Sequence, residues 1–130
     1  MPSQNRKAVR IPDLIINMLP KDTNGTGKNV FGGVLMHYMD MAALNAARKV
    51  CCSTIVTRAF ENILFEAPIH VGDSVYFYGS VAKVGRTSLT IELEVFALFT
   101  GTKARKVASA RCIFVAVDEN ERPTRLDMLN

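Results

Sequence analysis

The sequence predicts an α+β protein in which an antiparallel sheet packs against one long helix. Residues 33–50 contain no proline and repeat apolar side chains at helical spacing. After residue 50 the apolar repeat changes to the period of two that is typical of strands, and it stays so almost to the end of the chain. The strand-like segments are joined mainly by short turns, which favours antiparallel pairing over crossover connections.

The first elements are a strand and a loop. Residues 10–18 are rich in apolar side chains and predict a strand. We count Val9 as part of the start of this strand. Pro12 restricts this strand to a sheet edge or to its own end, because proline has no N–H to donate. Residues 21–29 are rich in Gly and Asn, which accept tight turns and left-handed backbone, and so predict a loop.

The long helix is predicted over residues 33–50. Its apolar side chains recur at helical spacing at Leu35, Met39, Ala42 and Ala46. Ala, Leu and Met all favour the helical backbone. Almost no polar stripe interrupts the segment before Arg48, so we expect a helix that is buried on all sides.

Four strands follow the helix. Their predicted ranges are residues 53–65, 75–81, 89–95 and 106–117. In the third of these strands apolar residues alternate with Thr90, Glu92 and Glu94, so one face should be buried and the other wet or paired. Turns are predicted at residues 68–73 and 84–87, and the polar residues 118–123 end the last strand.

The length and composition indicate one domain over residues 1–130. A chain of 130 residues is about as long as one ordinary domain, and no shift in composition divides it. With 48% hydrophobic and 22% charged residues it can build a core. The net charge of +4 suits an anionic ligand as well as nucleic acid. Nucleic acid is the poorer choice, because the chain has no Trp and no pattern of aromatic and basic residues that would stack bases.

The cysteines and the N-terminal residues predict a cytoplasmic protein. Three Cys is an odd number, and the adjacent Cys51 and Cys52 rarely bridge, which favours a reducing compartment. Residues 4–7 are polar, and the apolar stretch 15–19 contains Asn17, so no signal peptide is expected. Nowhere do apolar residues run for the roughly 18 positions of a membrane-spanning helix, and we expect no membrane partner.

Asp40 is an acidic residue within this apolar helix. Burying an unpaired carboxylate costs several kcal/mol or raises its pKa, so its presence suggests a chemical use. The alternative is that Asp40 faces a solvated seam or pairs with Arg48 or another basic group.

Two glycines mark the start of the helix. The unpaired N–H groups of a helix N-terminus can hold a developing negative charge, although Gly32 and Gly33 also fit an ordinary loop-to-helix turn. Together with Asp40 they place N–H donors and a carboxylate about two turns apart, a spacing that we take to suit an oxyanion hole beside a catalytic carboxylate.

Six short motifs, in this order, resemble the hotdog-fold acyl-CoA thioester hydrolases, the family of the bacterial cytoplasmic acyl-CoA thioesterases. They are DTN at residues 22–24, VFGGVLM at 30–36, MD at 39–40, VGD at 71–73, VGRTS at 84–88 and FVAVD at 114–118. The resemblance covers most of the chain. It implies a hotdog fold, in which an antiparallel sheet wraps around one long central helix, and protomers that pair so that active sites form at their interface.

The resemblance also implies roles for individual residues. Asp40 is the catalytic carboxylate, and Asn24 helps to position water or the thioester from across the interface. The backbone of Gly32, Gly33 and Val34 binds the thioester oxygen. The loop between Asn24 and the helix is one residue longer than the usual family pattern.

For coenzyme A, the resemblance points to the predicted turn after residue 84. Gly85, Arg86, Thr87 and Ser88 offer N–H groups, hydroxyls and a guanidinium, which are apt for phosphate. Arg58 is a further candidate. So is a basic cluster formed by Lys103, Arg105 and Lys106, although a solvated basic face is the commoner role for such residues.

The function implied is hydrolysis of acyl-CoA to a free carboxylic acid and CoA, with Asp40 as general base or as nucleophile. The alternative is a hotdog protein that binds or senses acyl-CoA without cleaving it. No cofactor is expected beyond the CoA of the substrate, and no metal, because no Cys or His spacing matches zinc. The cysteines are interpreted as packing thiols. The apolar helix and sheet face predict a homodimer. The resemblance implies that this dimer assembles further into a tetramer or hexamer.

Overall fold

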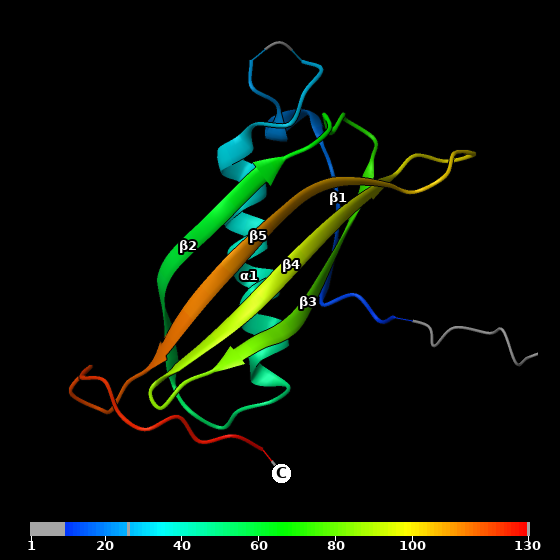
Figure 1. Ribbon diagram of the computed structural model, residues 1–130. Helices are drawn as coiled ribbons and strands as arrows, with labels where there is room; N and C mark the ends of the chain where they lie inside the picture. The colour runs from blue at the N-terminus through cyan, green and yellow to red at the C-terminus, as the bar shows by residue number, and fades with distance from the viewer. Residues whose placement is uncertain (1–9, 26, 130) are drawn as a thin grey trace, which may run out of the picture.

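The computed structural model describes residues 10–25 and 27–129, in which five antiparallel strands form one sheet that curves around one long helix (Figure 1). Val9, which we assigned to the first strand, lies outside the described residues. So do residues 4–7, whose polar character supported the expectation that there is no signal peptide. The elements in chain order are β1 (Leu14–Asn17), the 3-10 helix η2 (Pro20–Asp22), α1 (Gly32–Arg48), β2 (Ile55–Phe65), β3 (Ser74–Val84), β4 (Ser88–Leu98) and β5 (Arg105–Ala116). The predicted α+β class is confirmed.

The order of the strands in the sheet is β1-β3-β4-β5-β2. β3, β4 and β5 are consecutive antiparallel neighbours, as short turns require. β2 follows the helix in the chain, yet it pairs with β5 at the far side of the sheet and not with β3. β1 and β2 are therefore the two edge strands, and each keeps one hydrogen-bonding edge without a strand partner in the described part of the chain.

The first strand is shorter than the predicted range of 10–18. Pro12 has no N–H to donate to a ladder, and regular pairing begins at Leu14, although the N–H of Asp13 already donates to the carbonyl of Phe77 at 2.8 Å. The Asp13 carboxylate accepts hydrogen bonds from the N–H of Gly79 and from Nζ of Lys49, both at 2.7 Å. Asp13 thus ties the start of β1 to β3 and to the end of the helix.

The helix α1 buries only the side that faces the sheet. Its buried residues are Leu35, Met39, Ala42, Ala43, Ala46 and Ala47. The expectation of burial on all sides is wrong for the single chain, because one sheet covers one side of a helix. Gly33, His37 and Met41 form an exposed stripe with one residue in each successive turn.

The edge strand β2 is interrupted by two β-bulges. The pairing with β5 shifts between Thr57 and Ala59, which leaves Arg58 as an extra residue, and it shifts again between Glu61 and Leu64. Within the second irregularity Asn62 has a φ of 53°, in the left-handed region. These bulges decide which β2 side chains face the helix.

Gly79 of β3 lies where the sheet comes close to the helix. A Cβ added there would lie 2.7 Å from Cβ of Ala46 and 3.1 Å from Cγ2 of Ile91. Because these are short side chains in the packed core, Gly79→Ala is expected to destabilise the fold by about 1–3 kcal/mol, measured by urea unfolding. Adding Ala46→Gly, which alone costs about 1 kcal/mol, should recover part of the loss. Equal stability of Gly79→Ala and wild type would contradict this packing.

No helix in the described residues is both long and apolar enough to cross a bilayer.

Candidate functional site

Asp40 lies half-buried in the middle of α1 and faces β2. The hydroxyl of Thr57 donates a hydrogen bond of 2.7 Å to Oδ1 of Asp40. Among the described residues no Lys, Arg or His forms an ion pair with this carboxylate, so the alternative that it pairs with Arg48 or another basic group is wrong. The negative charge of Asp40 is oriented by a neutral hydroxyl and is not compensated by a cation.

Cys112 of β5 lies near Asp40 and Thr57 and is fully buried. Burial raises the pKa of its thiol to about 12, and the nearby negative charge of Asp40 acts in the same direction. A hydrogen bond with Thr57 opposes both effects on this pKa. At neutral pH Cys112 is therefore a protonated thiol and a poor nucleophile, as is usual for a buried structural cysteine.

The first turn of α1 offers free N–H donors. Among the described residues no main-chain carbonyl accepts from the N–H of Gly32 or Gly33, whereas the next two N–H groups bond to the carbonyl of Phe31. A Cβ at Gly32 would meet Phe65 no closer than 3.5 Å, and one at Gly33 would meet Phe31 at 3.8 Å, both ordinary contacts. The fold of the single chain therefore does not require glycine at either position.

Asn24 and Gly32 line the same cavity, which has a volume of about 280 Å³. The other lining residues are Asn29, Val30, Leu35, Phe65, Ala67, Pro68 and Ile69. The N–H of Asn24 donates to the carbonyl of Asn29 at 2.9 Å and closes the loop before the helix. Asp40 does not line this cavity.

Asp40 and the glycines of the same chain are too far apart to act on one carbonyl group. Asp40 lies eight residues after Gly32 and seven after Gly33 on one continuous helix, which is roughly 10 to 12 Å along the axis. An oxyanion donor and a carboxylate that serve one reacting carbonyl each need to lie within about 3 Å of it. The predicted spacing therefore does not suit one active site within a single chain.

The turn between β3 and β4 contains the four residues predicted to contact coenzyme A. The N–H of Gly85 donates to the carbonyl of Ser88 at 2.7 Å and closes the turn. The carbonyl of Arg86 accepts from the N–H of Leu126 and that of Thr87 from Ala116, both at 2.8 Å. These main-chain bonds fix the turn, while the side chain of Arg86 is exposed.

This turn lies at the end of the sheet where α1 ends, whereas the loop with Asn24 lies where α1 begins (Figure 1). The structure therefore does not bring Asn24, Asp40 and the turn together within one chain. Arg58, the remaining candidate for coenzyme A, is the exposed residue at the first bulge of β2.

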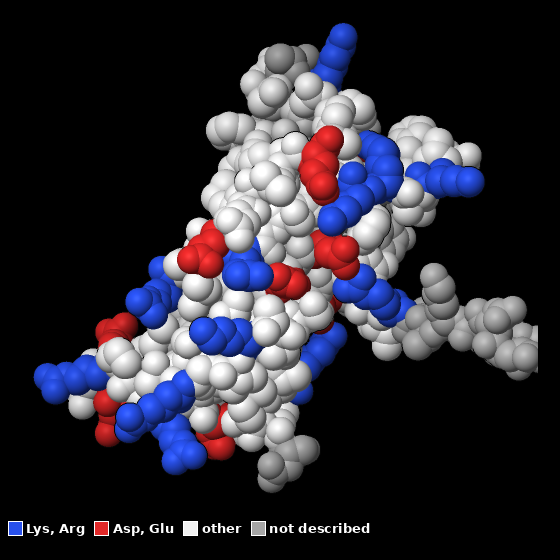
Figure 2. Space-filling view, in the orientation of Figure 1, with Lys and Arg blue, Asp and Glu red and all other residues white. Residues whose placement is uncertain are grey.

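Most of the predicted basic cluster is already paired. Arg105 donates to Oδ2 of the buried Asp73 at 2.7 Å. Lys106 lies between Glu66 at 3.8 Å and Glu94 at 3.7 Å. On the sheet face turned away from the helix, positive and negative side chains are interspersed (Figure 2). These two side chains are therefore poor candidates for a phosphate.

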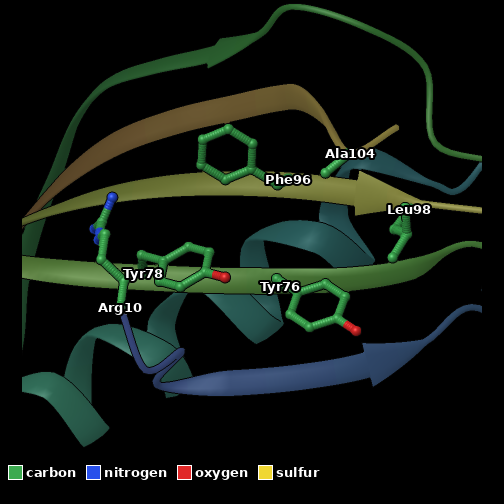
Figure 3. A pocket seen from close by; sticks show the side chains of 6 residues that line it. All are labelled: Arg10, Tyr76, Tyr78, Phe96, Leu98 and Ala104. Carbon is green, nitrogen blue, oxygen red and sulfur yellow. The ribbon is translucent and has the colours of Figure 1, made fainter. Parts of the chain in front are cut away.

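The same face carries an aromatic groove of about 530 Å³ (Figure 3). It is lined by Arg10, Tyr76, Tyr78, Phe96, Leu98 and Ala104. Arg10 lies 4.6 Å from the ring centre of Tyr78 and pairs with Glu94 at 2.8 Å. The sheet separates this groove from Asp40, and the carboxylate does not line it.

The described residues contain no cluster of three His, Cys, Asp or Glu side chains that would hold a metal ion. All three cysteines are free, with Cys51 and Cys112 buried and Cys52 exposed.

Sequence reasoning did not identify Thr57 as part of the site. A Thr in a strand is ordinary, and its contact with Asp40 depends on the packing of a helix against an edge strand. The signal present in the sequence is the break in alternation between Ile55 and Phe60, where a charged residue, Arg58, follows Thr57. Such a break indicates a bulge, and bulges are common beside functional sites.

Comparisons with known proteins agree with this architecture. The model of the Thioesterase superfamily matches residues 27–102. An uncharacterized acyl-CoA thioester hydrolase of Zymomonas mobilis is 37% identical over 120 residues, which are 92% of this chain and 80% of that protein. The crystal structure of a hexameric broad specificity acyl-coenzyme A thioesterase, in an aspartate-to-alanine mutant form, is 36% identical with a TM-score of 0.83, covering 90% of this chain and 86% of that one. A hexameric hotdog fold thioesterase of Campylobacter jejuni is 32% identical with a TM-score of 0.82, covering 89% of this chain and 90% of that one.

Proposed function

The chain belongs to the Thioesterase superfamily, and from this premise we propose that residues 1–130 are one hotdog domain that hydrolyses acyl-CoA thioesters to a free carboxylic acid and CoA. The observation that carries the proposal is the carboxylate of Asp40, which lies on an apolar helix without a basic partner in the described residues. A protein that only binds acyl-CoA gains nothing from such a group. Release of free CoA thiol from acyl-CoAs of several chain lengths tests the activity. Binding without release would favour the non-catalytic alternative.

Asp40 supplies the chemistry in one of two ways. As a general base it removes a proton from the water that attacks the thioester carbonyl. The bond between the carbonyl carbon and sulfur then breaks, and CoA leaves as the thiolate. As a nucleophile it attacks the carbonyl itself, the carbon–sulfur bond breaks and CoA thiolate leaves, and the mixed anhydride so formed is hydrolysed by water to the free acid and the Asp40 carboxylate. Thioesters are electrophilic enough for either route.

The thioester oxygen is held by the N–H groups of Gly32 and Gly33. Two observations support this role: neither N–H has a main-chain acceptor in the described residues, and neither glycine is required by the packing of the single chain. Because Asp40 of the same chain lies roughly 10 to 12 Å further along the helix, the complete site combines Asp40 of one protomer with Gly32, Gly33 and Asn24 of its partner.

Self-association is therefore part of the function. The open edge of β2 and the exposed stripe of α1 supply the paired surfaces of a homodimer, with Leu64 and Phe65 among the exposed apolar residues of β2. Two relatives described above are hexameric, and we extend the same assembly to this chain. The aromatic groove on the far sheet face is the contact surface between dimers, because that face remains open when dimers form through β2.

The nucleotide part of coenzyme A binds at the turn of Gly85, Arg86, Thr87 and Ser88, and Arg58 approaches from β2. The exposed guanidinium of Arg86 on a turn fixed by main-chain bonds supports this placement. No further cofactor is needed, since CoA is part of the substrate. The protein acts in the cytoplasm, which the three unpaired cysteines support.

Arg86→Ala is expected to raise KM for acyl-CoA about tenfold and to change kcat much less. The contact lies far from the scissile bond, so it stabilises ground state and transition state alike. Steady-state kinetics measure both constants. Because the attraction is electrostatic and exposed, added salt should weaken binding to the wild type more than to the variant.

The control for this substitution is an acyl-pantetheine substrate, which lacks the nucleotide. Its hydrolysis should not change with Arg86→Ala. Equal slowing of both substrates, or a lower kcat with unchanged KM, would place Arg86 in the catalytic centre or the fold and remove it from the coenzyme site.

A further inference from the structure

The loop before α1 contains the one Asn-Gly pair of the sequence, formed by Asn24 and Gly25. The side-chain amide of an asparagine can be attacked by the main-chain nitrogen of the next residue, because the two groups close a five-membered ring. A following glycine favours this attack, since it has no side chain to shield its nitrogen and its backbone adopts many conformations. Whether the reaction occurs depends on how firmly the fold holds the nitrogen of Gly25.

The surroundings of Gly25 leave its nitrogen able to react. Its φ is 93°, and a Cβ built on it would meet no atom within 4 Å. Its N–H donates to no main-chain carbonyl of the described residues. Asn24 and Gly25 are both exposed in the single chain. The nitrogen of Gly25 is therefore accessible and, within the described part of the chain, is not held in a main-chain hydrogen bond.

The other asparagines in the described residues are protected by the residue that follows each of them. Three are followed by an N–H that donates to a main-chain carbonyl at 2.8 or 2.9 Å, and these are Asn17, Asn29 and Asn120. Asn45 lies inside α1, where the next N–H donates along the helix. Asn62 precedes Ile63, whose branched side chain hinders approach to the nitrogen. The sequence and the fold together therefore single out Asn24.

We propose that Asn24 is a site of spontaneous deamidation, which inactivates the enzyme as it ages. The nitrogen of Gly25 attacks Cγ of Asn24, the bond from Cγ to Nδ2 breaks, and ammonia leaves. Water then opens the five-membered succinimide. Cleavage of the new bond gives aspartate, whereas cleavage of the original peptide bond gives isoaspartate, in which the main chain runs through the side chain. Water is the only other reactant, and a site that hydrolyses thioesters admits it.

Either product changes the cavity that Asn24 shares with Gly32. Aspartate puts a negative charge where, in the proposed function, the N–H of Gly32 stabilises a developing oxyanion, and like charges oppose that stabilisation. Isoaspartate adds a main-chain atom to the loop that the N–H of Asn24 closes on the carbonyl of Asn29 at 2.9 Å. The loss of turnover therefore rests on the proposed function, whereas the deamidation itself does not.

Peptide mapping by mass spectrometry tests the modification. The purified full chain is stored at neutral pH and sampled over time, and deamidation is measured as the mass gain of exchanging an amide for a carboxyl group. Asn24 should be modified before Asn17, Asn29 and Asn120, which are internal controls in the same molecule. Gly25→Ala places a side chain beside the attacking nitrogen and should slow the reaction severalfold. Equal rates in the wild type and Gly25→Ala, or earlier modification of another asparagine, would overturn the proposal.

Thiol release from acyl-CoA is measured on the same samples. The fraction of wild-type turnover lost should match the fraction of Asn24 modified, and fresh Asn24→Asp should turn over at least about tenfold more slowly than fresh wild type. Asn24→Gln keeps an amide but needs a six-membered ring for the same attack, so it should retain its own starting turnover during storage. Wild-type turnover in fresh Asn24→Asp would overturn the inactivation.

The two measurements separate this inference from the proposed function. If fresh wild type releases no thiol from any acyl-CoA, the proposed function fails and the inactivation with it, while the mapping still decides whether Asn24 deamidates. If the wild type is active and remains active after Asn24 is modified, the inactivation is overturned, and the proposed function stands without Asn24 in the site.

Discussion

Asp40→Asn is expected to lower the turnover of acyl-CoA by roughly 10² to 10⁴-fold while the protein stays folded. Asparagine has nearly the same size as aspartate, and its side-chain oxygen can still accept the hydroxyl of Thr57. It can neither take a proton from water nor attack a thioester. Steady-state release of free CoA thiol measures the loss, and circular dichroism with thermal unfolding checks the fold.

The controls for Asp40→Asn separate chemistry from binding. The variant should bind CoA as the wild type does, measured by calorimetry, because Asp40 lies apart from the turn that contains Arg86. A folded variant with near-normal turnover would remove Asp40 from the catalytic centre. A wild type that binds acyl-CoA but releases no thiol would instead identify a binding protein.

Leu64→Arg is expected to dissociate the assembly into monomers and to lower turnover more than about 100-fold. Leu64 lies on the open edge strand β2 and is 56% exposed in the single chain, so arginine there costs the protomer little. In an apolar interface the same side chain would bury an unpaired charge, at a cost of several kcal/mol. Light scattering at micromolar concentration measures the assembly, and thiol release measures the turnover.

Ile15→Arg is the matched control for Leu64→Arg. Ile15 lies on the opposite edge strand, β1, and is 50% exposed, so the two substitutions introduce the same charge at similar exposure. Ile15→Arg should leave both the dimer and the turnover intact. An active monomer of Leu64→Arg would contradict the sharing of Asp40, Gly32 and Gly33 between protomers. Dissociation by Ile15→Arg would place the dimer interface at β1 and contradict its assignment to β2.

The order and type of the elements are determined by local sequence. Helical spacing of apolar residues before residue 50 predicts α1, and alternation after it predicts the strands, because each period matches the geometry of one backbone conformation. Asp40 could be singled out in the same way. A carboxylate among apolar helix residues conflicts with its surroundings in the sequence itself, and such conflicts indicate function.

The tertiary structure alone decides how β2 is used. Its alternation fits an edge beside β3 as well as one beside β5, and the choice between them depends on long-range pairing that no local pattern contains. The bulge at Arg58, the bond from Thr57 to Asp40 and the position of Cys112 near them all follow from that choice. Thr57 and Cys112 are ordinary strand residues in sequence, and only the packing of β2 and β5 against α1 brings them to the carboxylate. The same packing leaves one stripe of the apolar helix exposed, because a single sheet covers only one side of it.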